Sequence, residues 1–396
     1  MKQGWTYKKL GEVIDHLRTG LNPRTHFKLN TPDAEGYYIT VRELKGFSIE
    51  PDEKTDKVNS AAIKRINERS NLKIGDVLFS GTGTIGKTAL VSELPENWNI
   101  KEGVYAMTPK HSELDSKYFI YYIGSEYFLR LVNDKAAGTG VRSIPMKELV
   151  KLTISLPPLS EQQRIVSRLD SAFAHIDALK ANAEKQLDDA KALFQKALEK
   201  AMEPKEGWEE KKLKEISSYS IGLTYKPTDV SEMGTIVLRS SNIQDDKLDL
   251  NDIVRVNCPI KENLYVKEGD ILMCSRNGSA RLVGKVAMLP SMNEKMTYGT
   301  FMMTIRSDYN PYLFYFFKSD TFRNQIKHGE ANMINQITRY MLDGVYVNTP
   351  PLSEQQAIVS RLDSLSEKVK KLQEVLDKTI KECDALKQAM LRQVFE

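Results

Sequence analysis

Two long stretches of the chain place an apolar side chain at every third or fourth position, from about residue 160 to 202 and from 353 to 390. This spacing keeps the apolar positions on one face of an α-helix. The apolar positions are Ile165, Leu169, Ala172, Ile176, Leu179, Ala183, Ala190, Leu193 and Ala197 in the first stretch, and Ile358, Leu362, Leu365, Val369, Leu372, Leu376, Cys383, Leu386 and Met390 in the second. Stripes of this length between charged flanks predict a pair of coiled-coil helices.

Both stretches open on a helix-start signal. In the first, Ser160 follows a Pro-Pro-Leu sequence and precedes Gln163 by three residues. Ser353 and Gln356 repeat the arrangement in the second. A serine followed three residues later by a glutamine is the pattern of a capping box, so we expect Ser160 and Ser353 to cap the two helices.

The two stripes are complementary in the size of their side chains. Small residues of the first correspond to large residues of the second, namely Ala172, Ala183 and Ala197 against Leu365, Leu376 and Met390. We therefore expect the two helices to pack on each other. The alternative, in which each helix packs separately on the globular part beside it, stays open.

The segments before each helix read as short strands broken by Gly, Asn and Pro. We expect strands at residues 37–41, 76–79, 87–91 and 105–108, and again at 236–238, 270–273, 285–288 and 301–305. One helix should close each segment, at residues 116–131 and 310–326. Each globular part is thus expected to be an α+β domain.

An internal repeat organises the whole chain. Residues 157–171 recur as residues 350–364 with a single difference, Arg164 against Ala357. Weaker echoes follow in the same order, while residues 41–64 and 238–261 diverge strongly. Ends and helices that repeat around interiors that differ suggest a reader of two different sequences. The predicted domains are residues 1–156, helix 157–203, residues 204–349 and helix 350–396.

The connection between the copies predicts the direction of the second helix. Only residues 203–206 separate the first helix from the second globular part, which therefore starts at the far end of that helix. If the termini of this part lie close together, as is common, the second helix runs back antiparallel. The expected fold is α+β, with two similar domains joined by two long antiparallel helices of about 60 Å and related by approximate two-fold symmetry.

Composition sets limits on function. The net charge of +4 is too mild to diagnose nucleic-acid binding by itself. The three cysteines are scattered and form no CxxC pair, which argues against a disulfide framework or a zinc site and fits a reducing cytoplasm. The longest aromatic-apolar run, residues 312–317, is too short to cross a bilayer, so no membrane association is expected.

One loop matches a nucleotide-binding motif. The run from Gly81 to Thr88 fits GxxxxGK[ST] and follows a strand. However, the next residues, 89–95, look like a short strand stopped by proline, so no long helix supplies a dipole to phosphate. The equivalent run, residues 277–286, lacks both the spacing and the hydroxyl residue. A turn that approaches DNA is the favoured interpretation, and a nucleotide-binding enzyme or a non-catalytic coiled-coil scaffold are the alternatives.

The paired runs PPLSEQQRIVSRLD and PPLSEQQAIVSRLD, each after a divergent domain containing GDVLFS or GDILMC, resemble specificity subunits of type I restriction–modification systems. The resemblance covers essentially the whole chain. It implies two target-recognition domains, each reading half of a bipartite site in double-stranded DNA, with the helices as a ruler for the unread spacer. It also implies no activity and no cofactor in this subunit. Two methyltransferase subunits would bring S-adenosylmethionine, and restriction subunits would use ATP and Mg²⁺.

Base readout favours Arg, Lys, Asn, Gln, Ser and Thr on loops or strand ends. On this basis we predict DNA contacts from Arg42, Thr82, Thr84, Lys87 and Arg142 in the first domain, and from Arg239, Arg276, Asn277, Arg281, Lys285 and Gln336 in the second. No catalytic residue is predicted.

Overall fold

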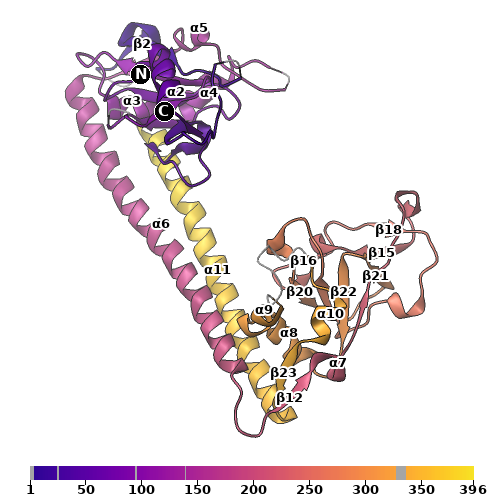
Figure 1. Cartoon of the computed structure of the whole chain (residues 1–396). Coiled ribbons are helices and arrows are strands. Elements are labelled where there is room, and N and C mark those ends of the chain that lie inside the picture. Colours follow the sequence, from indigo (N-terminus) through magenta and orange to yellow (C-terminus); the bar gives the residue numbers. More distant parts are fainter. Residues whose placement is uncertain (1–3, 25, 94–95, 139, 327–335) are drawn as a thin grey trace. The chain divides into compact units, whose positions relative to one another are not determined.

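The computed structural model describes residues 4–24, 26–93, 96–138, 140–326 and 336–396 (Figure 1). The chain divides into two compact units, which we call unit 1 (Met1–Ala183 with Asp377–Glu396) and unit 2 (Glu184–Leu376). Each unit holds one globular part and a portion of both long helices, α6 (Leu159–Met202) and α11 (Leu352–Phe395).

Unit 1 is built on a four-stranded antiparallel sheet of order β2-β10-β7-β8. A small sheet of order β6-β3-β9 and the pairs β1-β11 and β4-β5 complete it. The strands are β1 (Thr6–Lys9), β2 (Ile14–Thr19), β3 (Gly36–Ile39), β4 (Leu44–Lys45), β5 (Ser48–Ile49), β6 (Lys57–Val58), β7 (Val77–Ser80), β8 (Thr88–Leu90), β9 (Trp98–Ile100), β10 (Val104–Pro109) and β11 (Thr153–Leu156). The helices are α1 (Leu10–Val13), η1 (Val41–Glu43), α2 (Ser60–Ser70), α3 (Ser116–Ile123), α4 (Glu126–Asn133) and α5 (Met146–Leu149).

Unit 2 repeats this plan with the sheet β13-β22-β19-β20, a second sheet of order β14-β18-β15-β21 and the pairs β12-β23 and β16-β17. Its strands are β12 (Glu209–Lys212), β13 (Ser218–Ile221), β14 (Val230–Ser231), β15 (Thr235–Leu238), β16 (Ile243–Gln244), β17 (Lys247–Leu248), β18 (Arg255–Val256), β19 (Ile271–Cys274), β20 (Val286–Met288), β21 (Met296–Tyr298), β22 (Met302–Arg306) and β23 (Tyr346–Thr349). Its helices are α7 (Leu213–Ile216), η2 (Pro227–Asp229), η3 (Ser240–Asn242), η4 (Glu262–Leu264), η5 (Ala280–Leu282), α8 (Asn310–Lys318), α9 (Asp320–Ile326) and α10 (Arg339–Asp343). The strands expected from the sequence are all present, so the α+β prediction is confirmed.

The helix expected at the end of each globular part is in fact two helices. In unit 1, α3 ends at Ile123, and Ser125 caps α4 by accepting a hydrogen bond from Phe128 N at 3.3 Å. In unit 2, Ser319 separates α8 from α9 and accepts from Phe322 N at 3.2 Å. A serine that caps a new helix competes with continuation of the old one, so the chain turns at that point.

The predicted capping boxes are wrong. The helix α6 begins at Leu159, so Ser160 already lies in its first turn. The buried polar residue is Gln162, one position before the predicted Gln163. Its Nε2 donates to Pro157 O at 2.9 Å and to Glu113 O at 2.7 Å, and its Oε1 accepts from Asp115 N at 2.8 Å. Gln162 therefore ties the helix start to the turn before α3.

The start of α11 follows the same rule in unit 2. The helix begins at Leu352, ahead of the predicted cap Ser353. Gln355 is buried, and its Nε2 donates to Pro350 O at 2.7 Å. At each helix start, the repeated glutamine pair thus supplies one buried anchor and one exposed neighbour. In α6 these are Gln162 and Gln163, and in α11 they are Gln355 and Gln356.

The two long helices pack on each other and run antiparallel within each unit. In unit 1, Ile165 and Leu169 near the start of α6 share a core with Leu391 and Phe395 at the end of α11. In unit 2, Leu198 and Met202 at the end of α6 share a core with Ile358 and Leu362 at the start of α11. The prediction of a helix pair is confirmed, and the alternative of two separately packed helices is not what the structure contains.

The seam of α6 departs from the predicted stripe. Ile165, Leu169 and Ile176 are buried as expected, but Leu179 and Leu193 are 53% and 60% exposed. After Ile176 the inward position is four residues on, at Lys180, whose Nζ lies 2.8 Å from Asp384 of α11. A lysine buries its stem and holds its charge at the edge of the seam, so a search for apolar residues passes over it.

The same error recurs on α11. Ile358, Leu362 and Leu376 are buried and Val369 is half-buried, whereas Leu372 and Leu386 are 39% and 51% exposed. The inward position next to Leu386 is Lys387, which forms an ion pair with Asp177 of α6. Inward steps of four where three were predicted follow the 3.6-residue period of a straight helix more closely than a strict heptad does.

In the part of the chain that the structure describes, no helix could span a membrane.

A tyrosine fixes each globular part to the helix that follows it. Tyr315 of α8 donates to Asp363 Oδ1 at 2.5 Å, and Tyr121 of α3 donates to Asp170. Burial, and then the hydrogen bond to the aspartate, raises the pKa of both phenols. The phenols therefore stay protonated and act as donors. Both aspartates belong to the repeated 15-residue run, so the repeat carries the same anchoring contact in each unit.

Candidate nucleic-acid interface

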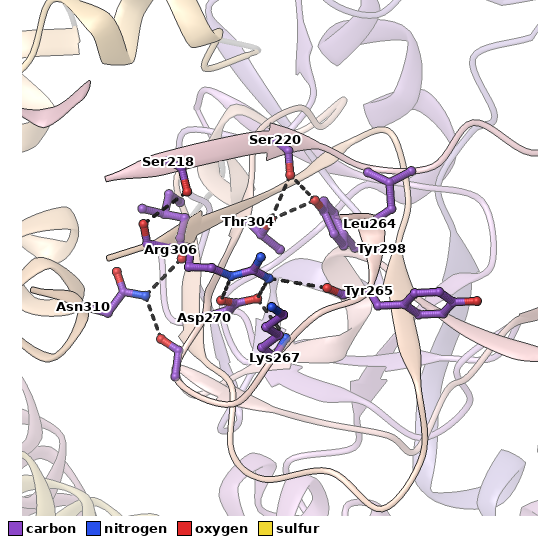
Figure 2. Close-up of polar contacts among 12 residues, drawn as sticks. Ser218, Ser220, Leu264, Tyr265, Lys267, Asp270, Tyr298, Thr304, Arg306 and Asn310 are labelled. Atoms are coloured by element: carbon purple, nitrogen blue, oxygen red, sulfur yellow. Dashed lines mark hydrogen bonds and ion pairs between the residues drawn. The ribbon is translucent and has the colours of Figure 1, made fainter. Parts of the chain in front are cut away.

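The Gly-Asp motif of each unit fixes the strand that leads into the candidate loop. In unit 2, Asp270 is 1% exposed and stands directly before β19. Its carboxylate accepts from Lys267 N at 2.8 Å and from Nε and Nη2 of Arg306, on the neighbouring strand β22, at 2.7 and 2.5 Å (Figure 2). Two parallel charge-assisted bonds make this pairing strong and directional. The motif is therefore structural, because it fixes the start of the strand whose other end leads into the loop.

The candidate loop of unit 1, residues 81–87, is the turn of a hairpin between β7 and β8. Ser80 Oγ donates to Thr84 O at 2.7 Å and accepts from Lys87 N at 2.8 Å. Gly86 has a φ of +98°, and a Cβ there would lie 2.3 Å from Leu129 Cδ2. Only glycine satisfies both conditions, so backbone and packing together hold the loop in shape.

This hairpin is not a nucleotide-binding loop. Phosphate-binding loops of that motif lead into a helix whose N-terminus faces the phosphates. Here Thr88 begins strand β8, which pairs antiparallel with β7. No described group of His, Cys, Asp and Glu side chains could hold a metal ion either. The match between Gly81 and Thr88 is thus a coincidence of sequence, as the expected strand after it indicated.

The structure brings four of the predicted unit 1 residues to one place. Thr82 pairs with Ser143 in an isolated antiparallel bridge, and Gly83 N donates to Arg142 O at 2.8 Å. Thr82, Thr84, Lys87 and Arg142 are all exposed. By contrast, Arg42 lies on η1 and pairs with Asp56 at 3.3 Å. Arg42 makes no described contact with the loop.

The candidate loop of unit 2, residues 275–285, occupies the same place between β19 and β20. Arg276 pairs with Gln336 in an isolated antiparallel bridge, as Thr82 pairs with Ser143. Ile337 N donates to Ser275 O at 2.7 Å, as Ile144 N donates to Gly81 O in unit 1. The two loops therefore make the same backbone contacts at their starts, whereas they differ in side chains and the unit 2 loop is longer and contains η5.

The remaining predicted residues of unit 2 have different surroundings. Asn277 Nδ2 donates to Ser240 Oγ at 3.2 Å, which joins the loop to η3. Arg239, just before η3, pairs with Asp252 at 2.8 Å. Lys285 is half-buried and donates to the carbonyl oxygen of Ile243, so its ammonium group links the end of the loop to β16.

Arg281 is exposed on η5, in the same loop as Arg276. Together, Arg239, Arg276, Asn277 and Arg281 stand on or beside one loop, so the structure gathers most of the predicted unit 2 residues.

A cleft beside this loop contains residues that the sequence did not single out. Its volume is about 770 Å³, and its lining includes Arg239, Ser240, Thr224, Tyr225 and Phe301. Phe301 is 54% exposed and lies in the turn before β22, whereas the sequence pattern had placed it inside a strand. An aromatic side chain at a strand start looks like core, so pattern alone gave no signal that it faces solvent.

Comparison with known proteins gives a family match that covers most of the chain. Residues 2–188 and 205–382 match the family model described as the type I restriction modification DNA specificity domain. The chain is 26% identical to the EcoKI specificity subunit of Escherichia coli K12, over 71% of this chain and 65% of that subunit. It is 24% identical to the putative MjaX specificity subunit of Methanocaldococcus jannaschii, over 96% of this chain and 91% of the relative.

Two solved structures share the fold. A chain from a study of complex assembly in the type I restriction–modification system superposes with a TM-score of 0.73 at 19% identity, covering 100% of this chain and 98% of that one. The HsdS subunit of Thermoanaerobacter tengcongensis gives 0.51 at 19% identity, with 100% and 97% covered.

Proposed function

Because the chain belongs to the type I restriction–modification DNA specificity family, we propose that it reads a DNA target in two parts, one short half-site by each unit. It is the specificity subunit of such a system, and it carries no catalytic site of its own. One observation supports the two-part target most directly. Equivalent hairpins present Thr82 and Ser143 in unit 1 but Arg276 and Gln336 in unit 2, so the two units offer different side chains on one scaffold.

The two long helices would set the distance between the half-sites. Each of them has 44 residues, which at about 1.5 Å per residue is a rod of about 65 Å. Half-sites one helical turn apart are separated by about 34 Å. A helix pair of this length, packed along ion pairs such as Lys180–Asp384, has the stiffness and scale to fix an unread spacer.

The chemistry would come from other subunits, in the cytoplasm. In the assembly we propose, two methyltransferase subunits bind S-adenosylmethionine, flip an adenine out of the duplex and methylate it. Restriction subunits bind ATP and Mg²⁺ and cut the DNA. One solved chain, of which this chain covers 98%, comes from a study of complex assembly in the type I system, which fits a subunit that works only with partners.

The test is to co-express the full chain with its methyltransferase subunit in a host that lacks adenine methylation, and to map the modified adenines across the genome. We expect a motif of two short specified halves separated by a fixed gap. Replacing residues 207–349 with those of another family member should change one half alone. A change in both halves, or a continuous motif without a gap, would contradict the assignment of one half-site to each unit.

A further inference from the structure

We propose that Arg276, held against the ring of Phe301, reads a guanine in the half-site of unit 2, and that unit 1 has no equivalent contact. This inference rests on the function proposed above and names one base and the pair of residues that selects it. Arg276 would be the specificity-determining residue, and Phe301 would be the positioning residue.

The backbone places Arg276 on a rigid edge. Arg276 N and Ser275 N both donate to Phe301 O at 3.0 Å, and Arg276 is bridged to Gln336 on its other side. The turn that carries Phe301 is closed by Met302 N, which donates to Gly299 O at 2.8 Å. Two hairpin connections therefore meet at Arg276, and its backbone is held from both sides.

The ring of Phe301 then orients the side chain of Arg276. The guanidinium carbon lies 5.5 Å from the ring centroid, within the range of a cation–π contact. Phe301 itself is 54% exposed. A guanidinium that an aromatic ring already holds in place loses little further freedom when it binds, and its N–H donors remain available to a ligand.

The charge of Arg276 is also available for a ligand. Its neighbour Arg239 is committed to Asp252 at 2.8 Å, and Lys285 donates to Ile243 O. Among the ion pairs of the described residues, none includes Arg276, and its side chain is exposed. An arginine with a free fork of donors matches O6 and N7 of guanine in the major groove, which is the commonest base-specific contact that arginine makes.

Unit 1 lacks both members of the pair. At the position of Arg276 it has Thr82, and at the position of Phe301 it has Gly103, whose carbonyl accepts from Gly81 N at 2.8 Å. Gly103 has a φ of +91°, and a Cβ there would lie 3.0 Å from Thr82 Cβ. An aromatic residue is therefore excluded at residue 103, and one threonine hydroxyl cannot offer two parallel donors.

The experiment uses the full chain assembled with its methyltransferase subunit. Methylation rates are measured on a library of duplexes that carries each of the four bases at every position of the wild-type motif. The variants are Arg276→Ala, Phe301→Leu and Phe301→Tyr. Arg323→Ala is the charge-matched control, since Arg323 is an exposed arginine of unit 2 outside the loop.

Arg276→Ala should reduce the preference for guanine at one position of the unit 2 half-site by about tenfold or more, with the other half-site unchanged. Phe301→Leu should weaken the same preference to a smaller extent. Phe301→Tyr keeps the aromatic ring and should keep the preference, and Arg323→Ala should leave every position unchanged. Retained reading of the unit 1 half-site shows that each variant is folded.

Three results would overturn the inference: relaxation at a position that is not guanine, relaxation at no position, or an equal loss on all duplexes, which marks a phosphate contact. These outcomes leave a two-part wild-type motif intact. Absence of a two-part motif for the wild-type complex would instead refute the proposed function.

Discussion

Arg18 on β2 donates from Nη2 to Oδ2 of the buried Asp76 at 2.8 Å, the task that Arg306 on β22 performs for Asp270. In unit 1, β2 lies beside β10, the strand equivalent to β22. The arginine has thus moved to the neighbouring strand, and Thr108 stands in unit 1 where Arg306 stands in unit 2. In both units the buried aspartate of the Gly-Asp motif pairs with an arginine, but the arginine comes from a different strand of the sheet.

This exchange predicts a rescue. Arg18→Ser should destabilise unit 1 by about 3 kcal/mol, because it leaves a buried carboxylate without its cation. Adding Thr108→Arg to that variant recreates the unit 2 arrangement and should recover much of the loss. Chemical denaturation of the full chain measures both. A double variant no more stable than Arg18→Ser would show that the two strands are not interchangeable.

The glutamine at the start of α6 gives a second prediction. Gln162→Ala should cost about 1–3 kcal/mol of unfolding free energy, because it leaves Asp115 N and two carbonyl oxygens without their partner. Its exposed neighbour is the matched control, and Gln163→Ala should change stability by less than about 0.5 kcal/mol. Ser160→Ala should be equally mild, whereas a large loss from Ser160→Ala would restore the serine as the cap.

Pattern alone located the helices well and their detailed contacts less well. The repeat, the strands around the Gly-Asp motif and the antiparallel pairing all followed from spacing and connectivity. The capping box failed because α6 begins at Leu159, ahead of the serine, and the buried polar contacts with Glu113 and Asp115 are made by Gln162. The seam failed at Leu179 and Leu386 because lysines, Lys180 and Lys387, occupy the inward positions beside them, which an apolar pattern cannot reveal.

The buried tyrosines predict a loss of stability in alkali. The pKa of Tyr315 is raised above the ordinary value of 10.0, first by burial and then by its bond to Asp363. Above about pH 10 the unfolded phenol releases its proton while the folded one keeps it, so stability falls as pH rises.

For each such tyrosine the unfolding free energy should drop by up to about 1.4 kcal/mol per pH unit. Tyr315→Phe should lose about 1–2 kcal/mol at neutral pH with the hydrogen bond and should also reduce the alkaline slope. Denaturant titrations at a series of pH values give both quantities, and an unaltered slope would show that Tyr315 ionises equally in both states.

The candidate interface was predictable in part. Loops bearing Gly and basic residues at equivalent places identified Thr82, Arg142, Arg276 and Gln336, which the structure brings together in pairs at two equivalent hairpins. Phe301 was missed because its neighbours form a strand. Its exposure depends on the turn closed by Gly299 and Met302, a tertiary feature with no period in the sequence.

The spacing role of the helices can be measured directly by inserting one heptad into each, after Gln186 in α6 and after Thr379 in α11, so that the antiparallel seam keeps its register. Seven residues lengthen a helix by about 10 Å, which is about three base pairs at 3.4 Å each. Mapping methylated adenines for the lengthened chain with its methyltransferase subunit should show both half-sites unchanged and the gap wider by about three base pairs. Methylation that persists with the original gap would contradict the claim that the helix pair sets the distance between the half-sites.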